Sequence, residues 1–258
     1  MTERLTVGPS DRGVRLVGLV KRFGARTVLD GLDLEIPSGQ VTAIIGRSGT
    51  GKSVLLKHIV GLLTPDEGRV VVDGADLAAL DEDGLASLRR RFGYVFQFAA
   101  LFDSMTIGDN IRLGLRRRGL DPAEIEARVR ESLQVVALPD AVERLPSELS
   151  GGMRKRAGIA RAIALRPDYI LFDEPTTGLD PVTTATMDTL MQRVRRDTGA
   201  TMVVVSHDMK SVFAVADRIA MLHEGRIRAA APREDFRAIE DPVVRDFLEG
   251  RADAGVAA

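Results

Sequence analysis

The segment GRSGTGKS, residues 46–53, constrains the fold of this chain more than any other feature. It fits the phosphate-loop pattern, in which two spaced glycines precede a Lys-Ser pair. The preceding run GQVTAII is continuously apolar, which is typical of a strand buried on both faces, and a helix is predicted from Lys52 to about Leu63. Backbone N–H groups of such a loop, together with the N-terminus of the helix, bind phosphate oxygens. The segment therefore predicts a nucleotide-binding α/β domain.

The whole loop is expected to hold ATP. Lys52 should reach the outer phosphates, and the Ser53 hydroxyl should bind Mg²⁺. The predicted ATP-binding residues of the loop are Gly46, Arg47, Ser48, Gly49, Thr50, Gly51, Lys52 and Ser53.

Strand and helix patterns alternate along most of the chain. The runs VRLVGLV and TVLDGLDLEI predict two strands in an N-terminal antiparallel β region, and DYILFDE and TMVVVSH predict two more strands with a helix near 181–198 between them. RIAMLHEGRIRAA reads as a hairpin. Such alternation predicts an α/β fold with a mainly parallel sheet and helices on both faces.

The pattern changes between Gln97 and Leu165, where apolar residues follow helical spacing and Asp121-Pro122 is a good helix start. A small α-helical subdomain inserted into the core is therefore expected. The predicted division is a flexible tail over 1–12, an ATP-binding core over 13–96 and 166–230, a helical subdomain over 97–165, and a C-terminal helical tail over 231–258.

The strand YILFDE ends in two carboxylates, Asp173 and Glu174. Beside a phosphate loop, Asp173 is expected to bind Mg²⁺, and Glu174 to act as the general base that polarises the attacking water. The alternative is an ordinary solvated strand end.

His207 ends another predicted strand, and strand C-termini are where ligands bind in such sheets. A neutral imidazole there could contact the γ-phosphate and align the water with Glu174. Gln97 follows the strand GYVF and could touch Mg²⁺ or the water. A structural histidine and an unremarkable glutamine remain the alternatives for these two residues.

The segment LSGGM places Ser150, Gly151 and Gly152 directly before RKRAGIARAIAL, which reads as a helix. Paired glycines mark places where the main chain approaches something closely. A hydroxyl, close N–H donors and a helix dipole would form a second anion-binding turn.

The order of these motifs resembles that of the ATP-binding-cassette (ABC) ATPases, over about residues 14–230. The resemblance implies the ABC type of P-loop NTPase fold with a RecA-like core, ATP hydrolysis, and a homodimer in which two cassettes stack head to tail. Ser150, Gly151 and Gly152 of one copy would then close the ATP site of the other, with Asp180 of TGLD near the same seam. The resemblance also implies that Phe23 stacks on adenine, with Val28 nearby. Met153 stands where the family commonly has glutamine.

Within that family, the stretches FQFAALFDS, LSGGM and DPVVRDFLEG are similar to the ATPase of the Mla phospholipid transporters, which work with MCE-type proteins. That similarity implies an integral membrane permease, an MCE-domain protein and often a small STAS-domain subunit. It also implies phospholipid transport at the cytoplasmic face of the inner membrane. Importers of other hydrophobic compounds share these features. Phe98, Leu101 and Phe102 either dock the permease or fill the helical subdomain, and the tail stripe around Val244 docks on its own domain or on other subunits.

The amino-acid composition excludes several classes of partner and of chemical site. The 36 basic and 37 acidic residues leave a formal charge of −1, so no nucleic-acid partner is expected. The chain has no cysteine, which excludes disulfides, thiolate nucleophiles and cysteine zinc sites. The first residues lack the apolar core of a signal peptide. A soluble cassette protein and a non-hydrolysing scaffold remain as alternatives, and the presence of Glu174, His207 and Gln97 argues against the scaffold.

Overall fold

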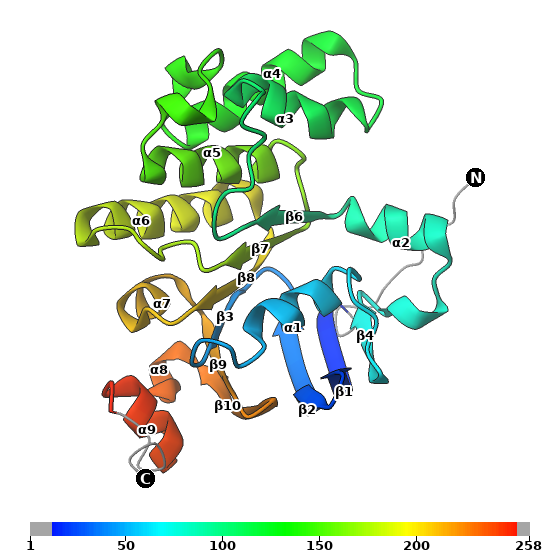
Figure 1. The fold of residues 1–258 in the computed structure, drawn as a ribbon, viewed down its shortest axis with the longest axis vertical. Helices are drawn as coiled ribbons and strands as arrows, with labels where there is room; N and C mark the ends of the chain where they lie inside the picture. The colour runs from blue at the N-terminus through cyan, green and yellow to red at the C-terminus, as the bar shows by residue number, and fades with distance from the viewer. Residues whose placement is uncertain (1–11, 252–258) are drawn as a thin grey trace. The chain divides into compact units, whose positions relative to one another are not determined.

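The computed structural model describes residues 12–251, which form two compact units: residues 12–89 with 216–251, and residues 90–215. Figure 1 follows their elements along the chain from blue to red. Residues 1–11 of the expected tail and the last residues, 252–258, lie outside the described part.

The first unit contains the expected antiparallel β region. Its four strands lie in the order β2 (Arg26–Pro37), β1 (Gly13–Phe23), β4 (Glu67–Val72) and β5 (Ala75–Asp76). Along β2 the side chains of Leu32, Leu34 and Ile36 are buried while the residues between them are exposed. This period of two is what the sequence of the strand predicts, because successive side chains point to opposite faces.

The phosphate loop of the first unit follows β3 (Val41–Ile45), all of whose residues are buried. β3 pairs in parallel with β9 (Arg218–His223), and β9 pairs antiparallel with β10 (Arg226–Pro232). The hairpin predicted from RIAMLHEGRIRAA is thus confirmed. Besides helix α1 (Lys52–Ile59), which follows the phosphate loop, the described part of this unit contains the helices η2 (Leu77–Ala79), α2 (Glu82–Arg89), α8 (Arg233–Phe236) and α9 (Pro242–Leu248).

Helix α1 (Lys52–Ile59) ends before Leu63, where the sequence pattern predicts its end. The reason is a helix stop signal at Gly61. Gly61 lies at φ 68°, and the N–H of Leu62 donates to the Lys57 carbonyl at 2.8 Å. This pattern is a glycine-terminated helix end that satisfies the last carbonyls.

The C-terminal helix α9 packs on its own unit. Val244 is fully buried, and Asp241, which caps the helix, pairs with Arg228 of β10 at 2.7 Å. Of the two alternatives for this segment, the structure shows docking on its own unit.

The second unit contains three parallel strands in the order β6 (Phe92–Val95), β7 (Tyr169–Asp173) and β8 (Thr201–Ser206). Its helices include one that the sequence reading missed, α7. They are α3 (Ile107–Arg116), α4 (Pro122–Val135), η3 (Pro139–Ala141), η4 (Pro146–Glu148), α5 (Gly151–Ile163), α6 (Pro181–Thr198) and α7 (Met209–Val215). The predicted helix start at Asp121-Pro122 is confirmed, since the Asp121 carboxylate accepts from the N–H of Ala123.

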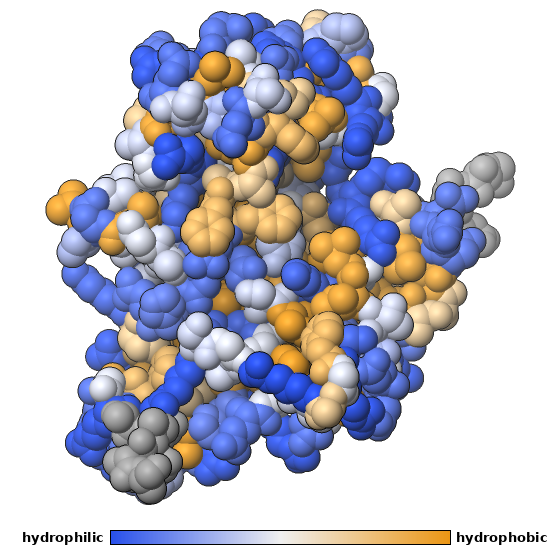
Figure 2. All heavy atoms as spheres, viewed as in Figure 1, coloured by the Kyte–Doolittle hydropathy of each residue, from blue (hydrophilic) through white to orange (hydrophobic). Residues whose placement is uncertain are grey.

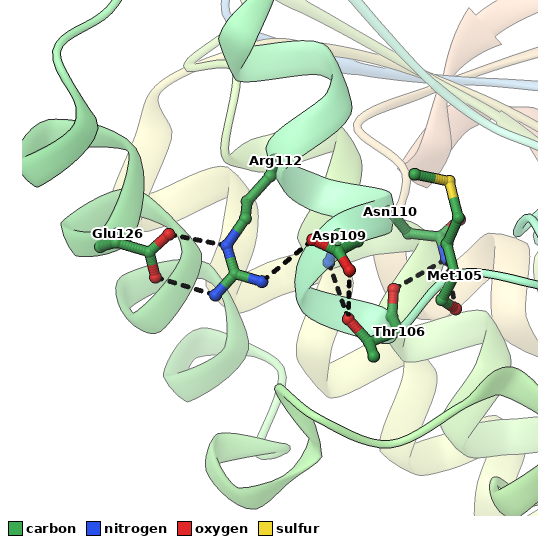
Figure 3. A network of polar contacts seen from close by, with 6 residues as sticks. All are labelled: Met105, Thr106, Asp109, Asn110, Arg112 and Glu126. Atoms are coloured by element: carbon green, nitrogen blue, oxygen red, sulfur yellow. Dashed lines mark hydrogen bonds and ion pairs between the residues drawn. The ribbon is translucent and has the colours of Figure 1, made fainter.

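A polar network at the start of α3 joins this helix to α4 (Figure 3). The guanidinium of Arg112 donates to both oxygens of Glu126 at 2.6 and 2.9 Å, and also contacts Asp109 at 3.3 Å. The two-pronged contact lowers the pKa of Glu126 below its ordinary value.

Asn110 is buried at the same helix end and holds the loop before it. Its amide oxygen accepts from the N–H of Phe102 at 2.7 Å, and its amide nitrogen also donates to the carbonyl of Phe102. The amide nitrogen donates further to the carbonyls of Met105 and Thr106 (Figure 3). One side chain therefore bonds four backbone groups of this loop and helix start, two of which, the carbonyls of Phe102 and Thr106, also accept from backbone N–H groups.

Replacing Asn110 by alanine should lower the free energy of unfolding by about 3 kcal/mol, because buried backbone groups of the loop lose their partners. Urea unfolding of Asn110→Ala measures the change. Gln134→Ala, at an exposed position of α4, is the control and should change stability by less than about 0.5 kcal/mol. An equal, small effect of both substitutions would contradict the role given to Asn110.

Candidate active site

Two glycines of the phosphate loop occupy positions that no other residue can take. Gly46 has φ 153°, and a Cβ there would lie 2.4 Å from the carbonyl oxygen of Leu222. Gly51 has φ 104°, and a Cβ there would lie 2.8 Å from Cγ1 of Val28. The loop therefore follows its tight path because both residues lack a side chain.

The loop is organised around the buried ammonium of Lys52, which donates to the carbonyls of Gly46 at 2.7 Å and Arg47 at 2.9 Å. The Thr50 hydroxyl donates to the same Arg47 carbonyl at 2.9 Å. Gly51 is the N-cap of α1 and has no side chain to cap it, and the first turn holds no acidic residue. The N-terminus of α1 thus presents backbone donors and positive dipole to an anion.

Phe23 and Val28 lie on the β-strands of the same unit. Phe23 ends β1 with its side chain 48% exposed, and the ammonium of Lys21 lies 5.7 Å from the centre of its ring. Val28 lies against the loop at Gly51. An exposed aromatic face at this strand end is able to stack on a planar group.

In the second unit the structure brings Glu174 and His207 together from the ends of the adjacent strands β7 and β8. Oε2 of Glu174 lies 2.8 Å from Nδ1 of His207 and accepts from the Thr177 hydroxyl at 3.0 Å. The backbone of Glu174 is left-handed, with φ 51°, and its N–H donates to the Val205 carbonyl at 3.0 Å. Non-glycine residues adopt this conformation rarely, so the surroundings hold Glu174 in a strained and fixed orientation.

Asp173 is buried at the end of β7 and accepts from the hydroxyl of Tyr94 at 3.1 Å. Burial, and then the charge of Asp173, raise the pKa of Tyr94. Sequence reasoning did not include Tyr94 among the site residues, although its position in the strand that leads to Gln97 indicated that it lies near the site. Gln97 lies two residues beyond the end of β6.

The segment around Ser150 opens α5, which begins at Gly151 and not at Arg154 as predicted. The Ser150 hydroxyl caps the helix by accepting from the N–H of Met153 at 3.3 Å. A Cβ on Gly152 would lie 2.8 Å from Cγ2 of Thr183, whereas one on Gly151 would meet nothing closer than 4.0 Å. Gly152 is therefore needed for packing against α6, and Gly151 leaves the helix N-terminus open.

Two helix N-termini meet at this point. Asp180 caps α6 by accepting from the N–H groups of Val182 and Thr183, and the hydrogen bond from the Thr183 hydroxyl is the largest cause that lowers the pKa of Asp180. A pocket of about 530 Å³ lies between the N-termini of α5 and α6. Its lining includes Ser150, Gly151, Gly152, Gly178, Asp180 and Thr183.

Lys155, which sequence reasoning also missed, ties α5 to the turn that follows Glu174. Its ammonium donates to the carbonyls of Pro175 at 3.0 Å and Thr177 at 2.6 Å, and Thr177 in turn holds Glu174. Burial lowers the pKa of Lys155, and the charge of Glu174 partly opposes that shift. Helix α5, which Ser150 caps, and the carboxylate of Glu174 therefore share one hydrogen-bonded frame.

A family model described as "ABC transporter" matches residues 29–177 of the chain. The chain belongs to the ABC transporter family. The cassette is 42% identical over 234 residues to the intermembrane phospholipid transport system ATP-binding protein MlaF of Escherichia coli K12, with 90% of this chain and 87% of that protein covered. It is 41% identical over 244 residues to the probable ribonucleotide transport ATP-binding protein mkl of Mycobacterium leprae, with 94% and 70% covered.

A solved dimeric ATP-binding cassette in a post-hydrolysis state bound to ADP and Pi has a similar fold. The TM-score is 0.78 at 33% sequence identity, over 85% of this chain and 98% of that one. This cassette is accordingly the ATP-binding, ATP-hydrolysing subunit of an ABC transporter, with the predicted P-loop fold. Within residues 12–251, no helix has the length and apolar character needed to cross a membrane.

Replacing Lys155 by alanine should lower kcat at least about tenfold with little change in KM for ATP, because the turn that carries Glu174 loses its anchor. Lys155→Arg should restore much of kcat. Because burial lowers the pKa of Lys155 and arginine stays charged, the arginine variant should also keep its rate to higher pH than the native chain.

Steady-state ATPase assays across pH measure these effects, with exposed Lys57→Ala as the control. A native kcat in the alanine variant, or loss of kcat in both variants alike, would exclude the positioning role.

Proposed function

We propose that this ATPase powers phospholipid transport between the inner and outer membranes, together with an integral permease and an MCE-domain protein. The supporting observation is the 42% identity to a phospholipid-transport ATPase over 90% of this chain. A small STAS-domain subunit fits the same system. Through the permease, the cassette would sit on the cytoplasmic face of the inner membrane. Its charge of −1 gives no reason to include nucleic acid among the partners.

ATP binding in this proposal uses the phosphate loop of one copy and the N-terminus of α5 of a second copy of the chain. The residues proposed to hold the nucleotide are Phe23, Gly46, Arg47, Ser48, Gly49, Thr50, Gly51, Lys52 and Ser53. In a head-to-tail homodimer, Ser150, Gly151 and Gly152 of the neighbouring copy close the γ-phosphate side, with Asp180 beside them. The pocket between the N-termini of α5 and α6 supports this role, because its hydroxyl and backbone donors suit a phosphate.

The hydrolytic step is assigned to Glu174, which accepts a proton from the attacking water as general base. His207 holds the Glu174 carboxylate at 2.8 Å and would contact the γ-phosphate, while Gln97 would orient the water. The strained backbone of Glu174 supports the assignment, since fixed and strained residues cluster at active sites.

Ser53, Gln97 and Asp173 are the residues proposed to hold Mg²⁺, whose role is to neutralise charge on the phosphates. A hydroxyl, an amide oxygen and a carboxylate are hard oxygen donors of the kind that Mg²⁺ prefers. No group of three acidic, histidine or cysteine side chains in the described part of the chain could hold a metal alone. That fits an ion bound by few protein oxygens and by nucleotide phosphates.

The loop after Gln97 is the proposed permease-docking surface. Phe98 and Phe102 are 85% and 54% exposed, so they do not fill the helical subdomain. Arg161 and Asn110 fix the loop, because Arg161 donates to the carbonyls of Ala99 and Ala100 and Asn110 holds Phe102. Figure 2 shows apolar side chains reaching an otherwise polar surface on the face drawn. Rigidly presented aromatic side chains are typical anchors of protein interfaces.

A second candidate cargo is ribonucleotides, which the name of the mycobacterial relative gives. An importer for another hydrophobic compound would use the same ATPase and the same docking loop. Purifying the tagged chain from detergent-solubilised membranes, with mass analysis of co-purified proteins and lipids, separates these possibilities. A permease, an MCE protein and bound phospholipid are expected. A permease without an MCE protein or phospholipid would refute phospholipid transport.

Glu174→Gln should lower the rate of ATP turnover about 100-fold or more and leave ATP binding intact, because only the proton acceptor is lost. The variant should therefore form a long-lived dimer in ATP and Mg²⁺, measured by light scattering after gel filtration. Glu143→Gln, at an exposed position of the same unit, is the control and should turn over normally. A Glu174→Gln chain that stays monomeric in saturating ATP would count against the closed dimer.

Phe102→Asp should uncouple ATPase activity from the permease, since a charge replaces an apolar anchor of the docking loop, while nucleotide affinity stays the same. Transport by the reconstituted complex and ATP affinity of the isolated chain are the two readouts. Leu62→Asp alters an apolar residue of nearly equal exposure, 53%, in the other unit and serves as the control. Unchanged transport in Phe102→Asp would rule out docking through this loop.

A further inference from the structure

Six arginines line an open pocket of about 570 Å³ in the second unit. They come from four segments that are distant in sequence: the start of β6, the turn after α3, helix α4, and the turn between α5 and β7. The lining consists of Arg90, Arg91, Arg117, Arg118, Arg128 and Arg166, with Leu120 and Asp168. Neither the ATPase chemistry nor the docking loop uses any of these residues.

Three of the guanidinium groups are neutralised by carboxylates at the pocket edge. Arg91 pairs with Asp168 at 2.6 Å, Arg128 with Glu124 at 2.6 Å, and Arg166 with Glu131 at 3.1 Å. Arg90, Arg117 and Arg118 have no carboxylate partner within the part of the chain that the structure describes. The pocket therefore carries surplus positive charge, although the whole chain has a formal charge of −1.

Arg118 shows how firmly this charge is built into the fold. Its guanidinium donates to the carbonyl of Leu165 at 2.7 Å and to the carbonyl of Arg90, so backbone oxygens hold it in place. Burial, and then the neighbouring charges of Arg128 and Arg90, lower the pKa of Arg118. Partly buried like charges repel one another, and an anion placed between them would relieve that cost.

We propose that this pocket binds a small anion with at least two phosphate groups or charges, supplied either as a free polyphosphate or as a phospholipid headgroup. Guanidinium groups bind phosphate oxygens in a two-pronged geometry, which favours phosphate over a monovalent ion. The volume of about 570 Å³ lies within the range of about 300–1,000 Å³ found for small-molecule sites. The pocket is concave and is lined by several segments, so it suits a compact anion better than it suits an extended ligand surface.

Pyrophosphate is the soluble probe, titrated calorimetrically in magnesium-free buffer into the full chain carrying Lys52→Ala, which weakens anion binding at the phosphate loop, and the variants below are made in this background. Arg90→Gln combined with Arg117→Gln removes two exposed guanidiniums that make no internal hydrogen bond described here, so the fold should persist. The combined variant should weaken binding at least tenfold. Arg130→Gln combined with Arg144→Gln changes the charge equally at exposed positions outside the pocket and should leave binding unchanged.

Co-sedimentation with vesicles of cardiolipin, whose headgroup carries two phosphates, compared with vesicles of phosphatidylcholine, provides the lipid arm. Loss of pyrophosphate binding in the pocket variant but not in the control supports a soluble polyphosphate ligand. Sedimentation with cardiolipin that depends on Arg90 and Arg117 supports a headgroup ligand. If neither probe binds, or if the pocket variant binds both as well as the native chain, the proposal is overturned.

Discussion

The hydrogen bond between Glu174 and His207 is the contact around which the second unit of the molecule is organised. It requires β7 and β8 to be parallel neighbours, because only then do both residues leave the sheet at the same end. It also requires Glu174 to adopt a left-handed backbone, which costs about 1–3 kcal/mol. Thr177, Val205 and, through the turn, Lys155 supply the contacts that offset this cost.

The same frame extends to the surface that we propose faces a second copy. Gly152 packs directly against Thr183, and Thr183 is part of the cap that Asp180 forms on α6. Lys155, one turn into α5, reaches two carbonyls, those of Pro175 and Thr177, in the turn that follows Glu174. A displacement of the N-terminus of α5 would therefore pass through Lys155 to the turn that holds Glu174.

Local patterns in the sequence predict much of this structure. The apolar runs locate β3, β7 and β8, and the Gly-Lys-Ser motif locates the phosphate loop, because burial and loop geometry leave few alternatives. The end of α1 was predicted too late, although Gly61 carries the stop signal. The start of α5 was also misplaced, since glycine is a poor helix former and only the Ser150 cap makes the first turn favourable.

Local sequence patterns could not predict which side chains meet when they are distant in the sequence. Lys155 lies in a run of basic residues that reads as a solvated helix face, and only the fold brings it to the carbonyls of Pro175 and Thr177. Tyr94 meets Asp173 because β6 and β7 are adjacent, which no local pattern states. The arginine pocket likewise depends on four segments meeting in space.

The account rests on a neighbouring copy supplying Ser150 to each ATP site, and a structure of the hydrolysis-deficient chain with ATP and Mg²⁺ tests this most directly. The distance from the Ser150 hydroxyl to the γ-phosphate bound by the other copy's Lys52 is the decisive quantity. We expect a hydrogen bond of about 3 Å. An ATP-bound assembly in which Ser150 lies far from every nucleotide would contradict the account.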